Sequence, residues 1–152
     1  MSAPEPRMTE EQVQEDLMRL EAYRNQLNAL LQQHQILSAS RQDHLRARES
    51  LEGVESTPAS SELLLPLGGE TFVRGSVDRD APVLVGMGSG IVVEMERPKV
   101  TELLAERTAR IEQALRDIEG QMASIDERIQ ALSQRLDVAA RERGTTTDVG
   151  SD

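Results

Sequence analysis

Cysteine and tryptophan are absent from this chain of 152 residues, which has one phenylalanine and one tyrosine. The absence of cysteine excludes disulfide bonds and thiolate chemistry. Because large aromatic side chains dominate compact cores, their scarcity argues against a globule with a deep core. The apolar residues are instead Leu, Val, Ile, Ala and Met, which suit a narrow helical seam and small β surfaces. One chain of this kind buries little apolar area, so we expect self-association to supply much of the stability.

Positive charge is also scarce, and the formal net charge is −10. Phosphate binding needs clustered Lys and Arg, so the acidic balance argues against nucleic acid and against an anionic membrane surface as partners. Lys99 is the only lysine among 17 basic residues. This acidic, arginine-using composition fits a salt-adapted cytosol, and it fits ordinary GC-rich codon bias equally well.

Long hydrophobic runs are missing as well, since no stretch approaches the roughly 20 apolar residues that a membrane span needs. The segment Met1–Arg7 contains two prolines and no hydrophobic region, so it lacks the pattern of a secretory signal. We therefore predict a cytoplasmic protein.

Two long heptad-patterned segments of nearly equal length are the main feature that is present. The first is predicted as a helix over residues 9–52, after a disordered lead-in at 1–8. It begins with a Thr9–Gln12 capping box, and Gly53 is its predicted stop. Its apolar residues follow steps of four, three, seven and four, with Arg24 in the skipped position. The predicted seam residues are Val13, Leu17, Leu20, Leu27 and Leu31.

The second helix is predicted over residues 98–143, before a disordered tail at 144–152. It opens with Pro98, which is tolerated at the first helical position. Its apolar residues alternate steps of four and three without a break: Ile111, Leu115, Ile118, Met122, Ile125, Ile129, Leu132, Leu136 and Ala139. Equal arms of this kind can fold back on each other as an antiparallel coiled coil.

The residues between the arms, 53–97, are rich in glycine and valine and predict four short strands. Asp78–Ala81 and Gly86–Gly90 are predicted hairpin connections. An isolated hairpin is marginally stable in water, so we expect two hairpins that join strands of other chains. The predicted fold class is α+β, mainly α: a long antiparallel two-helix coiled coil with two β-hairpins inserted between the helices.

No constellation of residues predicts catalysis, so we predict that the chain is not an enzyme. Gly86–Gly90 superficially resembles a phosphate-binding loop, but a strand is predicted after it, where such a loop needs a helix N-terminus. His34 and His44 are the only histidines, and their separation of ten residues is not that of a helical metal pair. The sequence thus predicts no catalytic residue, no cofactor and no metal site.

Apolar residues near the free ends of both arms are the candidates for a binding site. At the end of a two-helix coil such residues either close the seam or open and offer apolar area, at about 25 cal/mol per Å2 buried. Weak contact at many points suits unfolded polypeptides, and Met side chains adapt to varied partners. The candidate client-binding residues are Met8, Val13, Leu17, Leu132, Leu136 and Val138.

Residues 65–77 read Leu-Pro-Leu-Gly-Gly-Glu-Thr-Phe-Val-Arg-Gly-Ser-Val, and residues 83–94 read Val-Leu-Val-Gly-Met-Gly-Ser-Gly-Ile-Val-Val-Glu. These two segments closely resemble the two-hairpin region of the prefoldin α subunit. The order of arm, double hairpin and arm extends the resemblance over the whole chain. The presence of two hairpins, where the β class has one, makes the chain similar to the α class of prefoldin subunits.

The resemblance implies an ATP-independent holdase of archaeal type. Two α and four β subunits would form a hexamer through a double β-barrel platform, with non-native proteins held among the coiled-coil tips and delivered to a group II chaperonin. The tip residues above would be client contacts. The implied platform residues are Leu65, Phe72, Val73, Val77, Val83, Val85, Ile91 and Val93.

Two other functions remain open. A structural coiled-coil scaffold or adaptor would bind one fixed native partner and would not protect denatured clients. A nucleotide-dependent enzyme would use Gly86–Gly90 and would give a heat signal when titrated with ATP or GTP.

Overall fold

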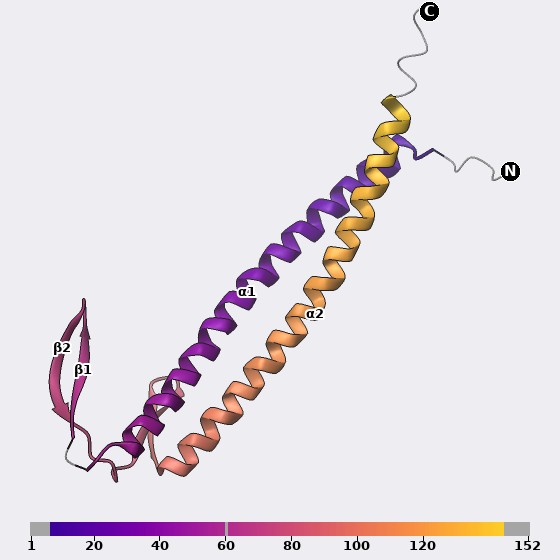
Figure 1. The fold of residues 1–152 in the computed structure, drawn as a ribbon. Coiled ribbons are helices and arrows are strands. Elements are labelled where there is room, and N and C mark those ends of the chain that lie inside the picture. Colours follow the sequence, from indigo (N-terminus) through magenta and orange to yellow (C-terminus); the bar gives the residue numbers. More distant parts are fainter. Residues whose placement is uncertain (1–6, 60, 145–152) are drawn as a thin grey trace, which may run out of the picture. The chain divides into compact units, whose positions relative to one another are not determined.

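The structure is a computed structural model that describes residues 7–59 and 61–144; residues 1–6, 60 and 145–152 lie outside the description. Most of the predicted lead-in and nearly all of the predicted tail therefore lie outside it. The elements, in chain order, are α1 (Glu10–Ser56), β1 (Glu62–Gly68), β2 (Thr71–Ser76), β3 (Val83–Gly88), β4 (Ile91–Met95) and α2 (Arg97–Gly144) (Figure 1). They divide into two compact units. We name them the helical unit (described residues 7–36 and 114–144) and the hairpin unit (residues 37–113).

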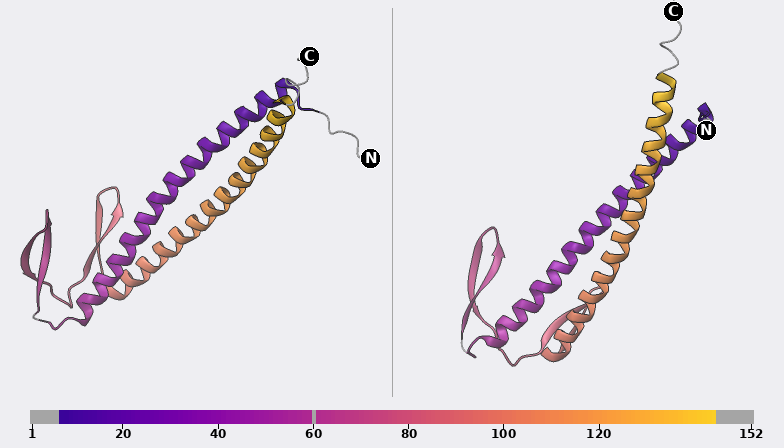
Figure 2. Two further views of the ribbon diagram at one scale, coloured as in Figure 1. Left: turned by 45° about the horizontal axis from the view of Figure 1, so that its top comes forward. Right: turned by 45° about the vertical axis from the view of Figure 1, so that its right-hand side comes forward.

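In the helical unit α1 and α2 run antiparallel, so that the start of α1 lies beside the end of α2 (Figure 1, Figure 2). The unbroken heptad pattern of α2 explains how this pairing buries one continuous stripe of aliphatic side chains. Within the helical unit, the α2 residues that are at most 9% exposed are Leu115, Ile118, Ile125, Leu132 and Ala139. The predicted seam of the second helix is thereby confirmed.

The predicted seam of α1 is wrong at every second position. Val13 and Leu27 are half-buried and Leu20 is 7% exposed, as expected, but Leu17 and Leu31 are 45% and 39% exposed. Asp16 and Leu30, each one position earlier, face α2 in their place, and Tyr23 does so in place of Arg24. The prediction chose Leu17 because it is apolar and passed over its charged neighbour. Leu17 and Asp16 both keep the heptad spacing, so hydrophobicity alone indicated the wrong set of α1 residues as the seam.

Helix α1 also extends beyond its predicted end at Gly53 and stops at Ser56. Gly53 does not adopt the left-handed backbone that commonly ends a helix. Leu51 and Val54 are half-buried and continue the apolar spacing through the last turn. The hydroxyls of Ser56 and Thr57 donate to the Gly53 carbonyl oxygen at 3.0 and 2.6 Å, which satisfies a carbonyl near the helix end.

The hairpin unit contains two separate two-stranded antiparallel sheets, β1–β2 and β3–β4. The prediction of two hairpins is confirmed, but Asp78–Ala81 is not a hairpin connection, because it joins β2 to β3 and these strands do not pair. Glycines at the ends of β1 and β3 signalled the true turns.

The two hairpins repeat the same turn design 20 residues apart. The two residues between the paired strands have a positive φ in both hairpins, Gly69 and Glu70 (φ 56° and 60°) in one and Ser89 and Gly90 (φ 52° and 77°) in the other, and so does the glycine that precedes each pair. Two such residues between paired strands make the type I′ turn that matches strand twist. In both hairpins the pairing shifts just before the turn, between Pro66 and Gly68 and between Gly86 and Gly88.

The hairpins differ in how they are held within the hairpin unit. Val85 of β3 is 8% exposed, and Arg107 of α2 donates to the Gly86 carbonyl oxygen at 3.2 Å. Arg97, also in α2, donates to the Asp78 carbonyl oxygen at 3.0 Å. By contrast, no described residue of β1 or β2 is buried. The second hairpin is thus fastened to α2, whereas both faces of the first are open.

Candidate functional site

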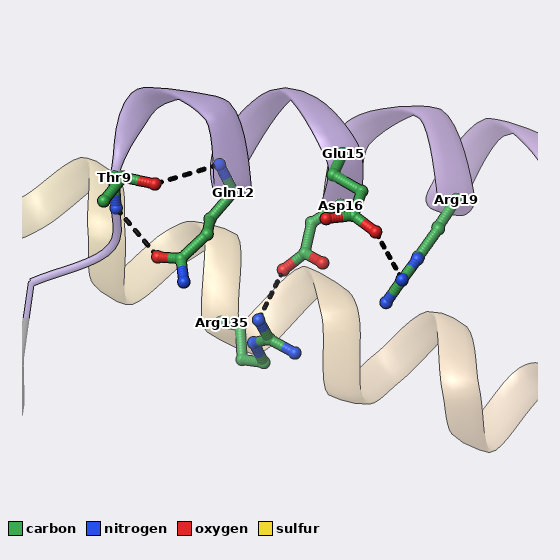
Figure 3. Close-up of polar contacts among 6 residues, drawn as sticks. All are labelled: Thr9, Gln12, Glu15, Asp16, Arg19 and Arg135. Atoms are coloured by element: carbon green, nitrogen blue, oxygen red, sulfur yellow. Dashed lines mark hydrogen bonds and ion pairs between the residues drawn. The ribbon is translucent and has the colours of Figure 1, made fainter.

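The first candidate site is the end of the helical unit where α1 begins and α2 finishes, here called the tip. Thr9 and Gln12 form the predicted capping box: the Thr9 backbone N–H donates to Gln12 Oε1 at 2.9 Å, and the Gln12 N–H donates to Thr9 Oγ1 at 3.2 Å (Figure 3). Glu15 and Arg19 form an ion pair one turn later. These local contacts hold the first turns of α1 in helical form, and so fix the directions of the side chains at the tip.

The predicted client-binding residues lie in three environments at the tip: exposed, buried and half-buried. Leu17 and Val138 are 45% and 55% exposed, so their side chains are available to another molecule. Leu132 is 8% exposed and belongs to the seam. The remaining three are half-buried: Met8, Val13 and Leu136. The tip therefore combines freely exposed apolar groups with others that become available only where the helices separate.

A hollow of about 540 Å3 lies between the start of the described chain and the last turns of α2. Met8 and Val138, both predicted as client-binding residues, line this hollow although they lie near opposite ends of the sequence. The lining residues that the sequence analysis missed are Ala131, Gln134, Arg135, Ala139 and Glu142. Several of these recur at steps of three and four along α2, so a helical-face count outward from Val138 could have found them.

An ion pair between a buried aspartate and an exposed arginine lies at the tip, and neither residue was predicted from the sequence. Asp16 is 2% exposed and is the only charged or polar residue that is buried among the described residues. Arg135 Nη2 lies 2.9 Å from Asp16 Oδ2 across the seam (Figure 3). No pattern in the sequence singles out this aspartate, because its burial depends on which line of α1 faces α2.

The second candidate site is the exposed apolar surface of the hairpins. Val83 is half-buried and Val85 is buried, while the other predicted platform residues are between 38% and 59% exposed: Leu65, Phe72, Val73, Val77, Ile91 and Val93. Further apolar side chains on these strands are as exposed or more so, and the prediction omitted them: Leu64, Leu67, Leu84, Met87 and Val92. Such dense apolar exposure on short strands is typical of a surface that another chain covers.

The two histidines and the glycine-rich segment, which were considered above as metal and phosphate sites, make local contacts in the structure. His34 Nε2 contacts Glu119 Oε1 at 2.9 Å between the helices, and His44 Nδ1 contacts the Ser40 carbonyl oxygen at 2.7 Å. Gly86–Gly90 joins β3 to β4, so no helix N-terminus follows it to receive a phosphate. Over residues 7–59 and 61–144, no three acidic or histidine side chains gather as a metal site would require.

None of the helices in the described part of the chain combines the length and the apolar character that crossing a membrane would require.

Comparison with known proteins places this architecture in one family. The family model of prefoldin subunits matches residues 23–142. The prefoldin subunit alpha of Archaeoglobus fulgidus is 30% identical over 135 residues, which cover 89% of this chain and 97% of the relative. The prefoldin subunit alpha of Methanocorpusculum labreanum is 27% identical, with 82% and 87% covered.

Two solved structures share the fold. The filamentous prefoldin of Methanocaldococcus jannaschii superposes with a TM-score of 0.65 at 19% identity, covering 77% of this chain and 97% of the other. The prefoldin beta subunit of Thermococcus strain KS-1 superposes with a TM-score of 0.58 at 22% identity, covering 88% and 96%. On the evidence of helices, hairpins and sequence together, the chain belongs to the prefoldin family, within which it is similar to the archaeal alpha subunits.

Proposed function

We propose that the chain is a subunit of an ATP-independent holdase, which binds non-native polypeptides at its tip and delivers them to a group II chaperonin. The observation that carries the proposal is the apolar tip, where Leu17 of α1 is exposed and where the exposed Val138 of α2 lines a hollow together with Met8. Contacts of this kind need no defined partner shape, since they depend on apolar area and on an adaptable Met side chain.

We further propose that the hairpins join a β-barrel platform with prefoldin beta subunits, in a hexamer of two alpha and four beta chains. The exposed apolar residues on both hairpins support this assembly, because a lone two-stranded sheet is marginal in water and gains stability from added strands. The fold likeness to a prefoldin beta subunit is also compatible with it.

The proposal that the tip binds non-native polypeptides can be tested with the assembled oligomer and a protein that aggregates on refolding. The double substitution Leu17→Ser and Val138→Ser removes exposed apolar groups without touching the buried seam, and we expect suppression of aggregation to fall severalfold. Ile36→Ser is the matched control, since Ile36 is an equally apolar residue of the helical unit, is 69% exposed and does not line the tip hollow. Equal loss with the control would refute the tip mechanism.

The platform can be tested by the mass of the complex formed with and without a beta subunit. Leu67 is 69% exposed at the irregular pairing before the first turn, so Leu67→Glu would place a charge in the proposed interface. We expect this variant to lose the high-mass complex, whereas Ile36→Glu keeps it. If Leu67→Glu assembles like the unaltered chain, the first hairpin does not form the interface.

The scaffold alternative predicts a different outcome in the same assays. A structural adaptor would bind one native protein saturably and leave an aggregating client unprotected at every concentration. No specific feature of the described residues favours that alternative over the holdase.

A further inference from the structure

Asp16 occupies a position that a coiled coil normally gives to an apolar side chain. It lies between Val13 and Leu20 on the face of α1 that contacts α2, and it is less exposed than either. The α2 residues that are buried in this unit are all aliphatic. The seam at the tip is therefore interrupted by one carboxylate, placed two turns from the start of α1.

The partner of Asp16 compensates the buried charge only in part. Arg135 Nη2 is 2.9 Å from Oδ2, but the geometry does not make a hydrogen bond, so charge alone holds the contact. The Asp16 side chain is 3% exposed, whereas that of Arg135 is 55% exposed. The carboxylate has thus lost its water while the guanidinium remains solvated, which weakens their attraction. Replacing a buried ion pair by well-packed apolar residues of similar volume is often neutral or stabilising, and here only the carboxylate is buried.

The same pair is joined to the hollow at the tip. Arg135 lines that hollow together with Met8 and Val138, while Asp16 reaches Arg135 from the opposite helix (Figure 3). If the pair parts, the seam residues on either side of it lose their cover. Leu20 and Leu132, each no more than 8% exposed in the closed seam, would then add their apolar area to that of the tip.

We propose that Asp16 is a positioning residue that holds Arg135 at the rim of the hollow and keeps the tip seam weak enough to open. The opened tip presents aliphatic seam residues of both helices to an apolar segment of a non-native polypeptide. This inference rests on the proposed holdase function for its consequence, whereas the weakness of the seam can be measured without any client.

Two substitutions on one ion pair distinguish this proposal from the simple loss of a contact. Asp16→Leu removes the buried charge and completes the aliphatic seam, so backbone hydrogen exchange over residues 11–20 and 130–140 should slow by about tenfold or more. Arg135→Met leaves the carboxylate buried without its partner, so exchange over the same residues should quicken by at least a similar factor. If the pair simply stabilised the tip, both substitutions would quicken exchange.

The functional measurement uses the assembled oligomer and an aggregating client protein. Asp16→Leu should lower the suppression of aggregation severalfold without changing the mass of the complex. The double variant Asp16→Arg and Arg135→Asp swaps the two charges. Its hydrogen exchange rates and its suppression of aggregation should be closer to those of the unaltered chain than the values for Asp16→Leu are. Glu21→Leu is the matched control, because Glu21 is an exposed acid further along the same helix and its loss should leave tip exchange within about twofold.

Exchange that is unchanged or faster in Asp16→Leu overturns the proposal. Slower exchange with full holding also overturns it, because opening would then not serve client binding. Should Asp16→Leu alter the mass of the complex, Asp16→Val, which removes the charge and places a smaller aliphatic side chain in the seam, gives the same two readings. A complete absence of holding by the unaltered oligomer would refute the proposed function, while the exchange measurements would still decide whether Asp16 weakens the seam.

Discussion

Helix α2 lines its side of the helical unit with aliphatic residues, whereas α1 places Asp16, Tyr23 and His34 among its leucines on the opposing side. Each of these polar residues reaches a charged partner on α2: Arg135, Arg128 and Glu119 respectively. One helix thus contributes apolar area and the other contributes polar contacts with defined partners. The difference teaches that more of the buried aliphatic side chains of the seam come from α2, whereas α1 contributes the polar groups that interrupt it.

The largest expected effect comes from a substitution in the aliphatic seam of α2. Leu115→Ala would remove a side chain that is 4% exposed and leave a cavity, at a cost of about 2–5 kcal/mol in the free energy of unfolding. Chemical denaturation followed by circular dichroism measures this cost. Met18→Ala, at a residue that is 66% exposed, serves as the control, and an equal loss in both variants would contradict the assigned seam.

A sharper test compares two neighbouring leucines of α1. Leu30 is 8% exposed and Leu31 is 39% exposed, so Leu30→Ala should cost about 1–3 kcal/mol more than Leu31→Ala. The two variants have the same composition and almost the same helix propensity, so denaturation midpoints can be compared directly. If Leu31→Ala proves the more damaging, α1 faces α2 through the line that its hydrophobic pattern first indicated.

The N-terminal cap of α1 gives a smaller effect. Thr9→Ala removes the hydroxyl that accepts from the Gln12 N–H, and we expect a loss of about 1 kcal/mol, concentrated in the first turn. Hydrogen exchange of residues 10–14 reports this fraying. Thr9→Ser keeps the hydroxyl and should behave like the unaltered chain; equal fraying in both would show that the cap does not hold the tip.

The smallest effect concerns the aromatic residue in the α1 seam. The Arg128 guanidinium carbon lies 5.7 Å from the centre of the Tyr23 ring, a distance at which a cation is attracted to the ring face. A double-mutant cycle with Tyr23→Leu and Arg128→Met should give a coupling free energy of about 0.5–1 kcal/mol. Tyr23→Phe retains the ring and should retain the coupling, and a cycle that closes at zero would remove this contact from the comparison.

Residues with one strong preference could be placed from the sequence. The unbroken aliphatic steps of α2 allow a single seam, the Thr9–Gln12 pair marks a helix start, and the glycines of Gly86–Gly90 mark a tight turn. Residues with two acceptable environments could not be placed. Leu17 and Leu31 fit a heptad as well as Asp16 and Leu30 do, and only the second pair faces α2.

The candidate tip divides in the same way. Its exposed apolar residues, Leu17 and Val138, were predicted from their position near the helix ends. The other walls of the hollow were not predicted: Gln134, Arg135 and Glu142 have no apolar signal, and only their helical spacing from Val138 points to them. Asp16 was missed for a related reason: a charged residue is normally solvated, and its burial follows from the partner that lies across the seam.

The amino-acid sequence by itself determined the succession of helix, two hairpins and helix, because helix periodicity, strand alternation and turn residues are local properties of the chain. The tertiary structure alone decided which line of α1 faces α2, that Asp16 is buried against Arg135, and that α2 fastens the second hairpin and not the first. Those outcomes depend on contacts between residues far apart in the chain, where packing one set of side chains requires that another be exposed.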